Sequence, residues 1–150
     1  MKMRSSRGVP DLLDASVWLS LSVPDHVHHT RARRYWEREA ADRVVFCRLT
    51  ALALLRHLSN PRVLGKAALT GDAAWHALQR WLALPETALL PEPPGVDELL
   101  GAWSAELTLR AGDWTDAYLA AFARAAGCRL VAFDGDFHRY PGVMLLHLTA

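Results

Sequence analysis

The chain has 150 residues, 51% of them hydrophobic and 22% charged, which suits one compact domain and excludes a disordered chain. No run of eighteen apolar residues predicts a membrane span, and the short basic segment 1–8 lacks the apolar stretch of a secretory signal. We therefore expect one domain over residues 1–150, with residues 1–8 as a flexible tail, in a cytoplasmic protein.

The net charge of +1 is unevenly distributed along the chain. Residues 1–66 contain twelve Lys and Arg against six Asp and Glu, whereas residues 67–150 contain five against ten. Arg, which supplies fifteen of the seventeen cations, binds phosphate and carboxylate with a planar guanidinium. This composition suits an RNA or an acidic partner, and a G+C-rich genome explains it equally well.

Short apolar strands alternate with helices in the first half of the chain. Residues 9–14 predict a buried strand followed by a turn, and residues 26–41 predict a helix with a basic face. A second strand is expected over residues 43–47 and a helix over residues 50–58. That helix has to stop at Asn60-Pro61, because the residue before a proline disfavours helical backbone.

The same alternation continues in the second half, with helices expected over residues 71–84, 96–109 and 113–126 and strands over residues 87–90, 129–133 and 143–148. Strands joined through helices form right-handed crossovers between parallel strands, and such sheets are covered on both faces. The sequence therefore predicts an α/β protein, a three-layer α/β/α sandwich with a central, mostly parallel sheet.

Three aspartates fall where such sheets bind ligands, beyond the carboxyl ends of the strands. Asp14 ends the first strand, Asp134 ends the strand over residues 129–133, and Asp116 lies in the first turn of the helix before that strand. Neighbouring carboxylates repel one another unless a hard cation joins them. We expect Mg²⁺, with Mn²⁺ as a substitute, bound by these three residues and by Asp136, and activating a water to attack a phosphodiester.

Each of these aspartates also has a purely structural explanation. Asp116 would be at the third position of a helix capped by Asp113, where it would complement the helix dipole. Asp134 could be a turn residue, and Asp14 could cap a following helical turn. Taken singly these explanations are the better ones, but three aspartates at one edge of the sheet favour the metal site.

The residues around the aspartates resemble a known family. Residues 12–17, Leu-Leu-Asp-Ala-Ser-Val, resemble the opening strand of PIN domains, and residues 114–123 and 130–137 are similar to the carboxy-terminal signature of bacterial VapC-type toxins. Segments 47–50, 55–56 and 59–63 also resemble the middle helix of one VapC subgroup. The resemblance extends over nearly the whole chain.

This resemblance implies a Mg²⁺-dependent endoribonuclease, the toxic component of a type II toxin–antitoxin system. It also implies a homodimer and a small antitoxin, encoded by an adjacent gene, that neutralises the toxin. Asp14, Asp116 and Asp134 would take the catalytic, acidic-site roles.

The chain departs from the family pattern at two positions. Ala53 stands where many PIN nucleases have Glu in the middle helix, and Ala132 stands where they have Thr or Ser. Either Asp136 or Asp113 replaces the missing charge, or the site binds its metal more weakly. The alternative is therefore a catalytically weakened PIN module that binds RNA or a protein partner without cleavage. A DNA nuclease, which uses the same metal chemistry, is a third hypothesis.

Further side chains are candidates for RNA contact. Arg34 lies on the basic face of the helix predicted over residues 26–41, which could follow an RNA backbone, contact the antitoxin or simply face solvent. Arg56, on an otherwise apolar helix, needs a carboxylate or phosphate partner if it is buried. Trp18 could stack on an unpaired RNA base or pack in the core.

A histidine cluster and two cysteines have no predicted metal chemistry. The cluster of His26, His28 and His29 lacks a second group of Cys or His at ligand spacing, so we interpret it as a polar helix start rather than a zinc site. Cys47 and Cys128 lie beside predicted strands, as buried free thiols do. No glycine-rich phosphate loop and no nucleophile elbow occur, which disfavours P-loop nucleotide hydrolysis and acyl transfer.

Overall fold

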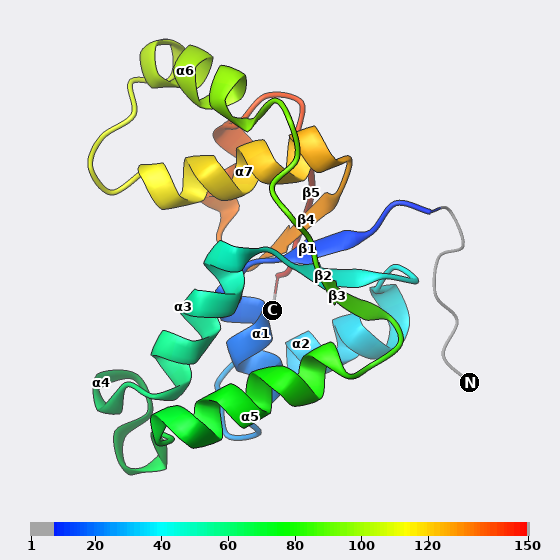
Figure 1. The fold of residues 1–150 in the computed structure, drawn as a ribbon, viewed down its shortest axis with the longest axis vertical. Helices are drawn as coiled ribbons and strands as arrows, with labels where there is room; N and C mark the ends of the chain where they lie inside the picture. Colours follow the sequence, from blue (N-terminus) through cyan, green and yellow to red (C-terminus); the bar gives the residue numbers. More distant parts are fainter. Residues whose placement is uncertain (1–7, 150) are drawn as a thin grey trace.

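A five-stranded, fully parallel sheet forms the middle layer of the protein in the computed structural model, which describes residues 8–149 (Figure 1). The strands are β1 (Asp11–Leu13), β2 (Val44–Phe46), β3 (Thr87–Leu89), β4 (Arg129–Ala132) and β5 (Met144–His147), in the order β3-β2-β1-β4-β5. The basic tail predicted over residues 1–8 lies, apart from Gly8, outside the described residues.

Helices cover both faces of the sheet, which confirms the three-layer sandwich (Figure 1). On one side lie α1 (Ala15–Ser22), α2 (His29–Arg34) with a π-helical turn (Tyr35–Glu39), α3 (Arg48–Leu58), α4 (Pro61–Leu64) with a 3₁₀ turn (Gly65–Ala67), and α5 (Gly71–Leu82). On the other side lie α6 (Val96–Glu106) and α7 (Trp114–Ala126). A 3₁₀ helix, Gly135–Arg139, joins β4 to β5.

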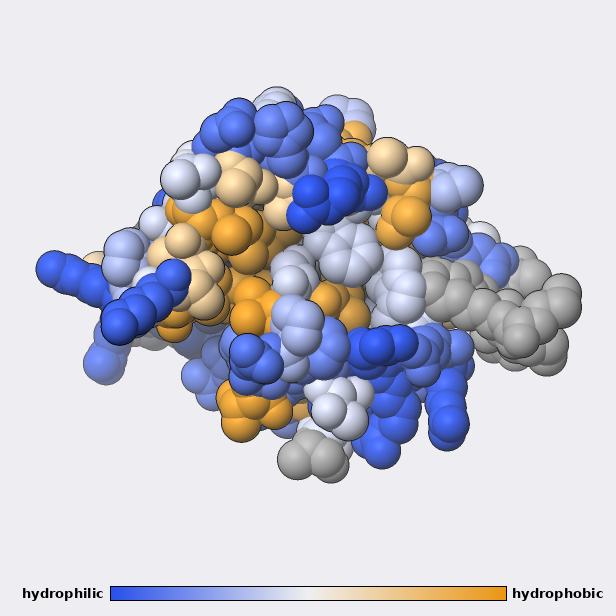
Figure 2. Space-filling view, turned by 90° about the horizontal axis from the view of Figure 1, so that it is seen from below, coloured by the Kyte–Doolittle hydropathy of each residue, from blue (hydrophilic) through white to orange (hydrophobic). Residues whose placement is uncertain are grey.

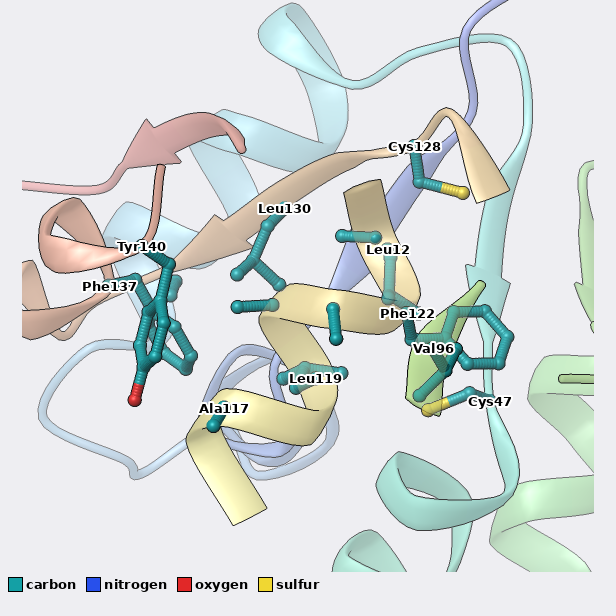
Figure 3. Packing of buried hydrophobic residues seen from close by; sticks show 14 of the residues in the cluster. Leu12, Cys47, Val96, Ala117, Leu119, Phe122, Cys128, Leu130, Phe137 and Tyr140 are labelled. Atoms are coloured by element: carbon teal, nitrogen blue, oxygen red, sulfur yellow. The ribbon is translucent and has the colours of Figure 1, made fainter. Parts of the chain in front are cut away.

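Alternating side chains of the strands supply the two halves of the core. Leu12 and Leu130 pack against α7, together with Leu119 and Phe122 of that helix (Figure 3). The next residue on each strand points the other way, and Leu13 packs with the buried residues of α1, α3 and α5. The central strands β1, β2 and β4 are therefore buried on both faces, which is why each of them appears in the sequence as a short apolar run.

Most predicted elements are confirmed, with ends that shift by one to three residues. The stop at Asn60-Pro61 is also real, but a short helix, α4, begins at once. The Asn60 side chain caps this helix by accepting a hydrogen bond from the backbone N–H of Arg62, and Pro61 suits the first helical position. Within the described residues, no helix has the length and apolar character needed to cross a membrane.

The turn expected after Asp14 is wrong, because the eight residues of α1 follow directly. This helix is buried on most sides, so its sequence lacks the alternation of apolar and polar faces that marks a surface helix. Its serines also disfavour helix in isolation. Here Ser20 and Ser22 donate hydrogen bonds of 2.7 Å to the carbonyl oxygens four residues earlier, which satisfies both hydroxyls inside the helix.

The helix expected over residues 26–41 is shorter and less regular than predicted. It begins at His29, and its last turn is π-helical, with the Ala40 backbone N–H donating to the carbonyl oxygen of Tyr35, five residues back. This wider turn brings the Tyr35 hydroxyl to the buried carboxylate of Asp11, to which it donates a hydrogen bond. The irregular end of the helix thus coincides with a buried polar contact between Tyr35 and Asp11.

Asp11 is the anchor of the amino-terminal edge of the sheet. Its carboxylate, fully buried, accepts two hydrogen bonds from the guanidinium of Arg129, of 2.8 and 2.9 Å, and one from the backbone N–H of Ala41. Arg129 also donates to the carbonyl oxygen of Glu39. These contacts tie β1, β4 and the segment after the π-helical turn together, at the end of the strands opposite to Asp14.

Candidate acidic active site

A pocket of about 220 Å³ opens beyond the carboxyl end of β1, between the first turns of α1 and α7 and the length of α3. Two of the predicted site residues, Asp14 and Asp116, line it, and so does Arg56. The remaining lining residues are Ala15, Ser16, Leu49, Thr50, Ala53, His57, Thr115 and Leu119. The fold therefore brings together side chains that are about one hundred residues apart in the sequence.

Asp14 is the N-cap of α1 and is held in place by its neighbours. One carboxylate oxygen accepts a 2.8 Å hydrogen bond from the backbone N–H of Ala15, and the other accepts a 3.2 Å hydrogen bond from the hydroxyl of Ser16. Burial raises the pKa of Asp14, and the two hydrogen bonds partly offset this rise. The capping interpretation is thus correct for Asp14, and the same carboxylate also faces the pocket.

Asp116 is the most perturbed acid of the site. Its pKa is raised to about 6, first by burial and then by the negative charges of Asp14, Asp134 and Asp136. No hydrogen bond or ion pair to this carboxylate occurs within residues 8–149, and Asp113, the residue before α7, makes no side-chain cap. A half-buried carboxylate surrounded by like charges is poorly compensated in the metal-free protein.

Asp134 and Asp136 lie on the exposed turn that follows β4. The Asp134 carboxylate accepts a 2.8 Å hydrogen bond from the backbone N–H of Asp136, so the turn interpretation is correct for this residue. Asp134 does not line the pocket, but its charge raises the pKa of both Asp14 and Asp116. The charges of Asp14, Asp134 and Asp136 thus all act on Asp116.

The donor set of the site fits a hard divalent cation such as Mg²⁺ or Mn²⁺. All four candidate ligands are carboxylates, and the pKa of Asp116 is raised by burial and, to a smaller extent, by the charges of the other three. Among the described residues, no three Asp, Glu, His or Cys side chains stand close enough to form a metal cluster by themselves. The chemistry of the donors, rather than a closed cage, therefore supports metal binding.

We expect Asp116→Asn to stabilise the metal-free protein by about 1 kcal/mol at pH 7. Because the folded pKa lies near 6 and the unfolded value near 3.8, the folded state binds the extra proton between these pH values, and stability falls as pH rises through this window. The expected energy is smaller than the energy equivalent of the full pKa shift, because the Asp116 side chain is partly exposed and solvent screens its charge. Urea unfolding in EDTA at pH 4 and pH 7.5 measures the effect.

Asp97→Asn is the matched control for this experiment, since Asp97 is an exposed acid in the first turn of α6. It loses only its interaction with the helix dipole, so a small destabilisation is expected. Equal stability changes for the two variants at pH 7.5 would contradict the electrostatic origin of the effect at Asp116.

Two residues of α3 define the wall opposite Asp116. Ala53 lines the pocket, so a longer acidic side chain at this position would point into it. His57, one helical turn further on, lines the same pocket; burial and Arg56 lower its pKa, and Asp14 raises it. His57 was not among the residues predicted for the site, although its spacing of four residues from Ala53 places it on the same helix face.

Two candidates for RNA contact have to be revised. Trp18 is fully buried and stacks on Phe46 with a ring separation of 3.9 Å, so the expectation that it could stack on an RNA base is wrong and core packing is its role. Arg34 is exposed on α2 but does not line the acidic pocket. Asp113 is engaged elsewhere, accepting from the Arg110 backbone N–H and pairing with Arg139, which argues against it as a replacement acid.

An apolar groove of about 450 Å³ runs beside the acidic pocket, between α3 and α5. Leu52 and Trp75 lie in it with half of their surface exposed. Leu49 and Arg56 line both the groove and the acidic pocket, so the two are contiguous. Viewed from the side of α4 and α5, hydrophobic surface gathers in the middle of the face between hydrophilic side chains (Figure 2).

The sequence and the fold of this chain are similar to those of known proteins. The model of the PIN domain family matches residues 12–143. Ribonuclease VapC41 of Mycobacterium tuberculosis is 37% identical over 139 residues, which cover 89% of this chain and 95% of that protein. The crystal structure of M. tuberculosis VapC20, described as a sarcin–ricin loop cleaving toxin, has a TM-score of 0.66 at 21% identity, over 89% of this chain and 97% of that one. A chain of a toxin–antitoxin complex from Klebsiella pneumoniae has a TM-score of 0.61 at 18% identity, and the match covers 93% of this chain and 98% of that one.

Proposed function

Because the chain belongs to the PIN domain family and is homologous to VapC ribonucleases, we propose that it is a Mg²⁺-dependent endoribonuclease and the toxin of a toxin–antitoxin pair. The observation that carries the proposal is the pocket shared by Asp14 and Asp116. Burial in that pocket, together with the negative charges of Asp14, Asp134 and Asp136, raises the pKa of Asp116 to about 6. Such a site suits a cation that joins the carboxylates and a phosphodiester.

In this proposal Asp14, Asp116 and Asp134 hold the metal, with Asp136 as a fourth ligand and Mn²⁺ as a substitute for Mg²⁺. When bound there, such an ion would supply an activated water and positive charge to offset the negative charge that develops on the phosphate. The chain fixes the orientation of Asp14 through the Ala15 backbone N–H and the Ser16 hydroxyl, so this ligand is preorganised.

Arg56 contributes the positive side of the pocket. It is exposed, it lines the same cavity as the two acids, and its guanidinium can donate two parallel hydrogen bonds to a phosphate oxygen pair. We propose that Arg56 binds an RNA phosphate and thereby positions the chain to be cut. Single-stranded or looped RNA is the expected substrate, because its backbone and bases can enter a narrow pocket.

The antitoxin is proposed to occupy the apolar groove between α3 and α5. Leu52 and Trp75 expose large apolar surface there, and an amphipathic helix is a usual occupant of such a groove. Since Arg56 lines both the groove and the pocket, a segment bound in the groove lies at the entrance of the nuclease site. We also expect the toxin to be a homodimer.

The test of the proposal is cleavage of purified tRNA and rRNA by the purified protein in EDTA, in Mg²⁺ and in Mn²⁺. We expect discrete fragments in either metal and none in EDTA, because the carboxylates alone cannot activate water. Asp116→Asn, prepared in parallel, controls for a contaminating nuclease and should be inactive. Single-stranded DNA of matched length separates a ribonuclease from a DNA nuclease.

Intact RNA under all these conditions would overturn the nuclease proposal. If the protein then still bound RNA without metal, and Asp116→Asn bound it equally well, the weakened PIN module would be the better interpretation.

A further inference from the structure

Two aromatic rings are stacked at the edge of the molecule, next to the acidic turn. The His28 ring lies on the Phe133 ring with a centroid distance of 4.5 Å and an interplanar angle of 21°. His28 is exposed, whereas Phe133 is partly buried against the core cluster on the α1 side of the sheet. The stack thus has a packed inner ring and an outer ring at the protein surface.

The outer ring is held in place by the histidine cluster that the sequence analysis left without a role. The backbone N–H of His28 donates a 3.0 Å hydrogen bond to Nδ1 of His26, whose ring lies 3.3 Å from the hydroxyl of Ser20. His29 Nδ1 is 2.7 Å from the carbonyl oxygen of the same serine. Burial lowers the pKa of His26, which keeps its Nδ1 available as an acceptor. The segment that carries His28 is therefore preorganised against α1.

The inner ring is part of the turn that carries the acids. Phe133 immediately precedes Asp134, and its carbonyl oxygen is 2.9 Å from Nε2 of His147. The His147 ring packs closely on Gly135, where an added Cβ would lie 3.1 Å from the ring. These contacts fix the position of Phe133 relative to Asp134, and so the stacked pair relative to the acidic residues.

We propose that the outer face of the His28 ring, supported by Phe133, is a nucleobase-stacking subsite for single-stranded RNA beside the acidic residues. The inference rests on the proposed ribonuclease function and adds to it a residue that binds substrate. Unpaired bases stack on aromatic rings irrespective of their identity, and a ring held rigidly by a second ring loses little conformational entropy on binding.

If His28 only covered the apolar ring of Phe133, its replacement by another apolar side chain would not affect RNA binding. Any apolar side chain of similar size would cover Phe133, but only a planar ring can stack on a base. His28→Leu and His28→Phe therefore distinguish the two roles. His76→Ala is the matched control, since His76 is an exposed histidine on α5 that contacts Asp72 of the same helix.

The experiment measures binding of a short single-stranded RNA that carries one 2-aminopurine, in Mg²⁺ and in an Asp14→Asn background that prevents cleavage. We expect His28→Leu to weaken binding by about fivefold or more and to abolish the quenching of 2-aminopurine fluorescence. His28→Phe should retain the RNA affinity and the quenching, and His76→Ala should change neither the affinity nor the quenching. An RNA that has an abasic site in place of the 2-aminopurine should bind to the His28→Leu variant as tightly as to its parent.

Equal RNA affinity and equal quenching for the His28→Leu variant and its parent would overturn the inference. The same holds if Leu and Phe at this position weaken binding equally. The outcome is separable from that of the nuclease proposal, because the metal dependence of cleavage by the unaltered protein tests the metal site whether or not a base stacks on His28. In the cleaving protein, His28→Leu should raise KM with little change in kcat.

Discussion

Asp14→Asn is expected to lower kcat/KM for RNA cleavage by about a thousandfold, the largest functional effect that we predict for one substitution. The change replaces the charged carboxylate of a proposed metal ligand by a neutral amide in the pocket that it shares with Asp116. A bound divalent ion contributes several kcal/mol to stabilisation of the transition state, and a loss of about 4 kcal/mol corresponds to this factor. Gel analysis of a labelled RNA at saturating Mg²⁺ measures the change.

The substitution is informative because the fold should tolerate it. Asp14 caps α1 through the Ala15 backbone N–H, and Asn is an equally good capping residue. The unfolding midpoint of Asp14→Asn should therefore stay close to that of the parent protein or rise slightly, since a half-buried charge is removed. Asp72→Asn, which alters an exposed acid on α5, is the control and should cleave normally.

Growth after induced expression provides a second measurement of the same prediction. Expression of the parent chain should arrest growth and produce new RNA fragments, whereas Asp14→Asn should do neither. Arrest by both proteins with intact RNA would contradict the nuclease mechanism. Cleavage by Asp14→Asn at the parental rate would remove Asp14 from the metal site.

Arg129→Ala is expected to destabilise the protein by about 3 kcal/mol, the largest effect on stability. Asp11 is fully buried, and Arg129 donates two of the hydrogen bonds that satisfy its carboxylate. Removing the guanidinium leaves a buried negative charge with only the Tyr35 hydroxyl and the Ala41 backbone N–H as donors. An uncompensated buried charge is costly, whereas the intact pair contributes little net stability.

Urea unfolding of the parent and Arg129→Ala at pH 7 checks this expectation. Arg33→Ala serves as control, because the Arg33–Glu37 ion pair is exposed on one helix surface, and such pairs contribute about 0.5 kcal/mol or less. Replacing Asp11 and Arg129 together by Asn and Met should recover part of the loss. If Arg129→Ala were no less stable than Arg33→Ala, the buried pair would not be the anchor that the contacts indicate.

The strands and the acidic residues could be predicted because their signals are local. Each strand of this sheet is a short apolar run between turn residues, and the carboxyl ends of parallel strands meet at one edge. That rule is sufficient to bring Asp14 and Asp134 together without any knowledge of packing. The resemblance of the surrounding segments to VapC-type toxins indicated the same residues.

What could not be predicted depends on contacts between distant segments. Asp11 and Asp14 are three residues apart at opposite ends of one strand, and only the positions of Tyr35 and Arg129 show that Asp11 is structural. In the same way, α1 is buried on most sides and so shows no helical period in its sequence, and Trp18 is buried beneath Phe46 of β2, which stacks on it. Local propensity carries no information about such partners.

The side chains shared by the groove and the acidic pocket limit how this protein can evolve. Leu49 and Arg56 belong to both surfaces, so if the antitoxin binds in the groove as proposed, a substitution of either residue that weakens its binding also alters the wall of the pocket. A substitution of Leu49 or Arg56 that reduces inhibition would therefore also tend to reduce cleavage. Selection for new inhibitor specificity would act first on Leu52 and Trp75, which line only the groove and can change without touching the pocket.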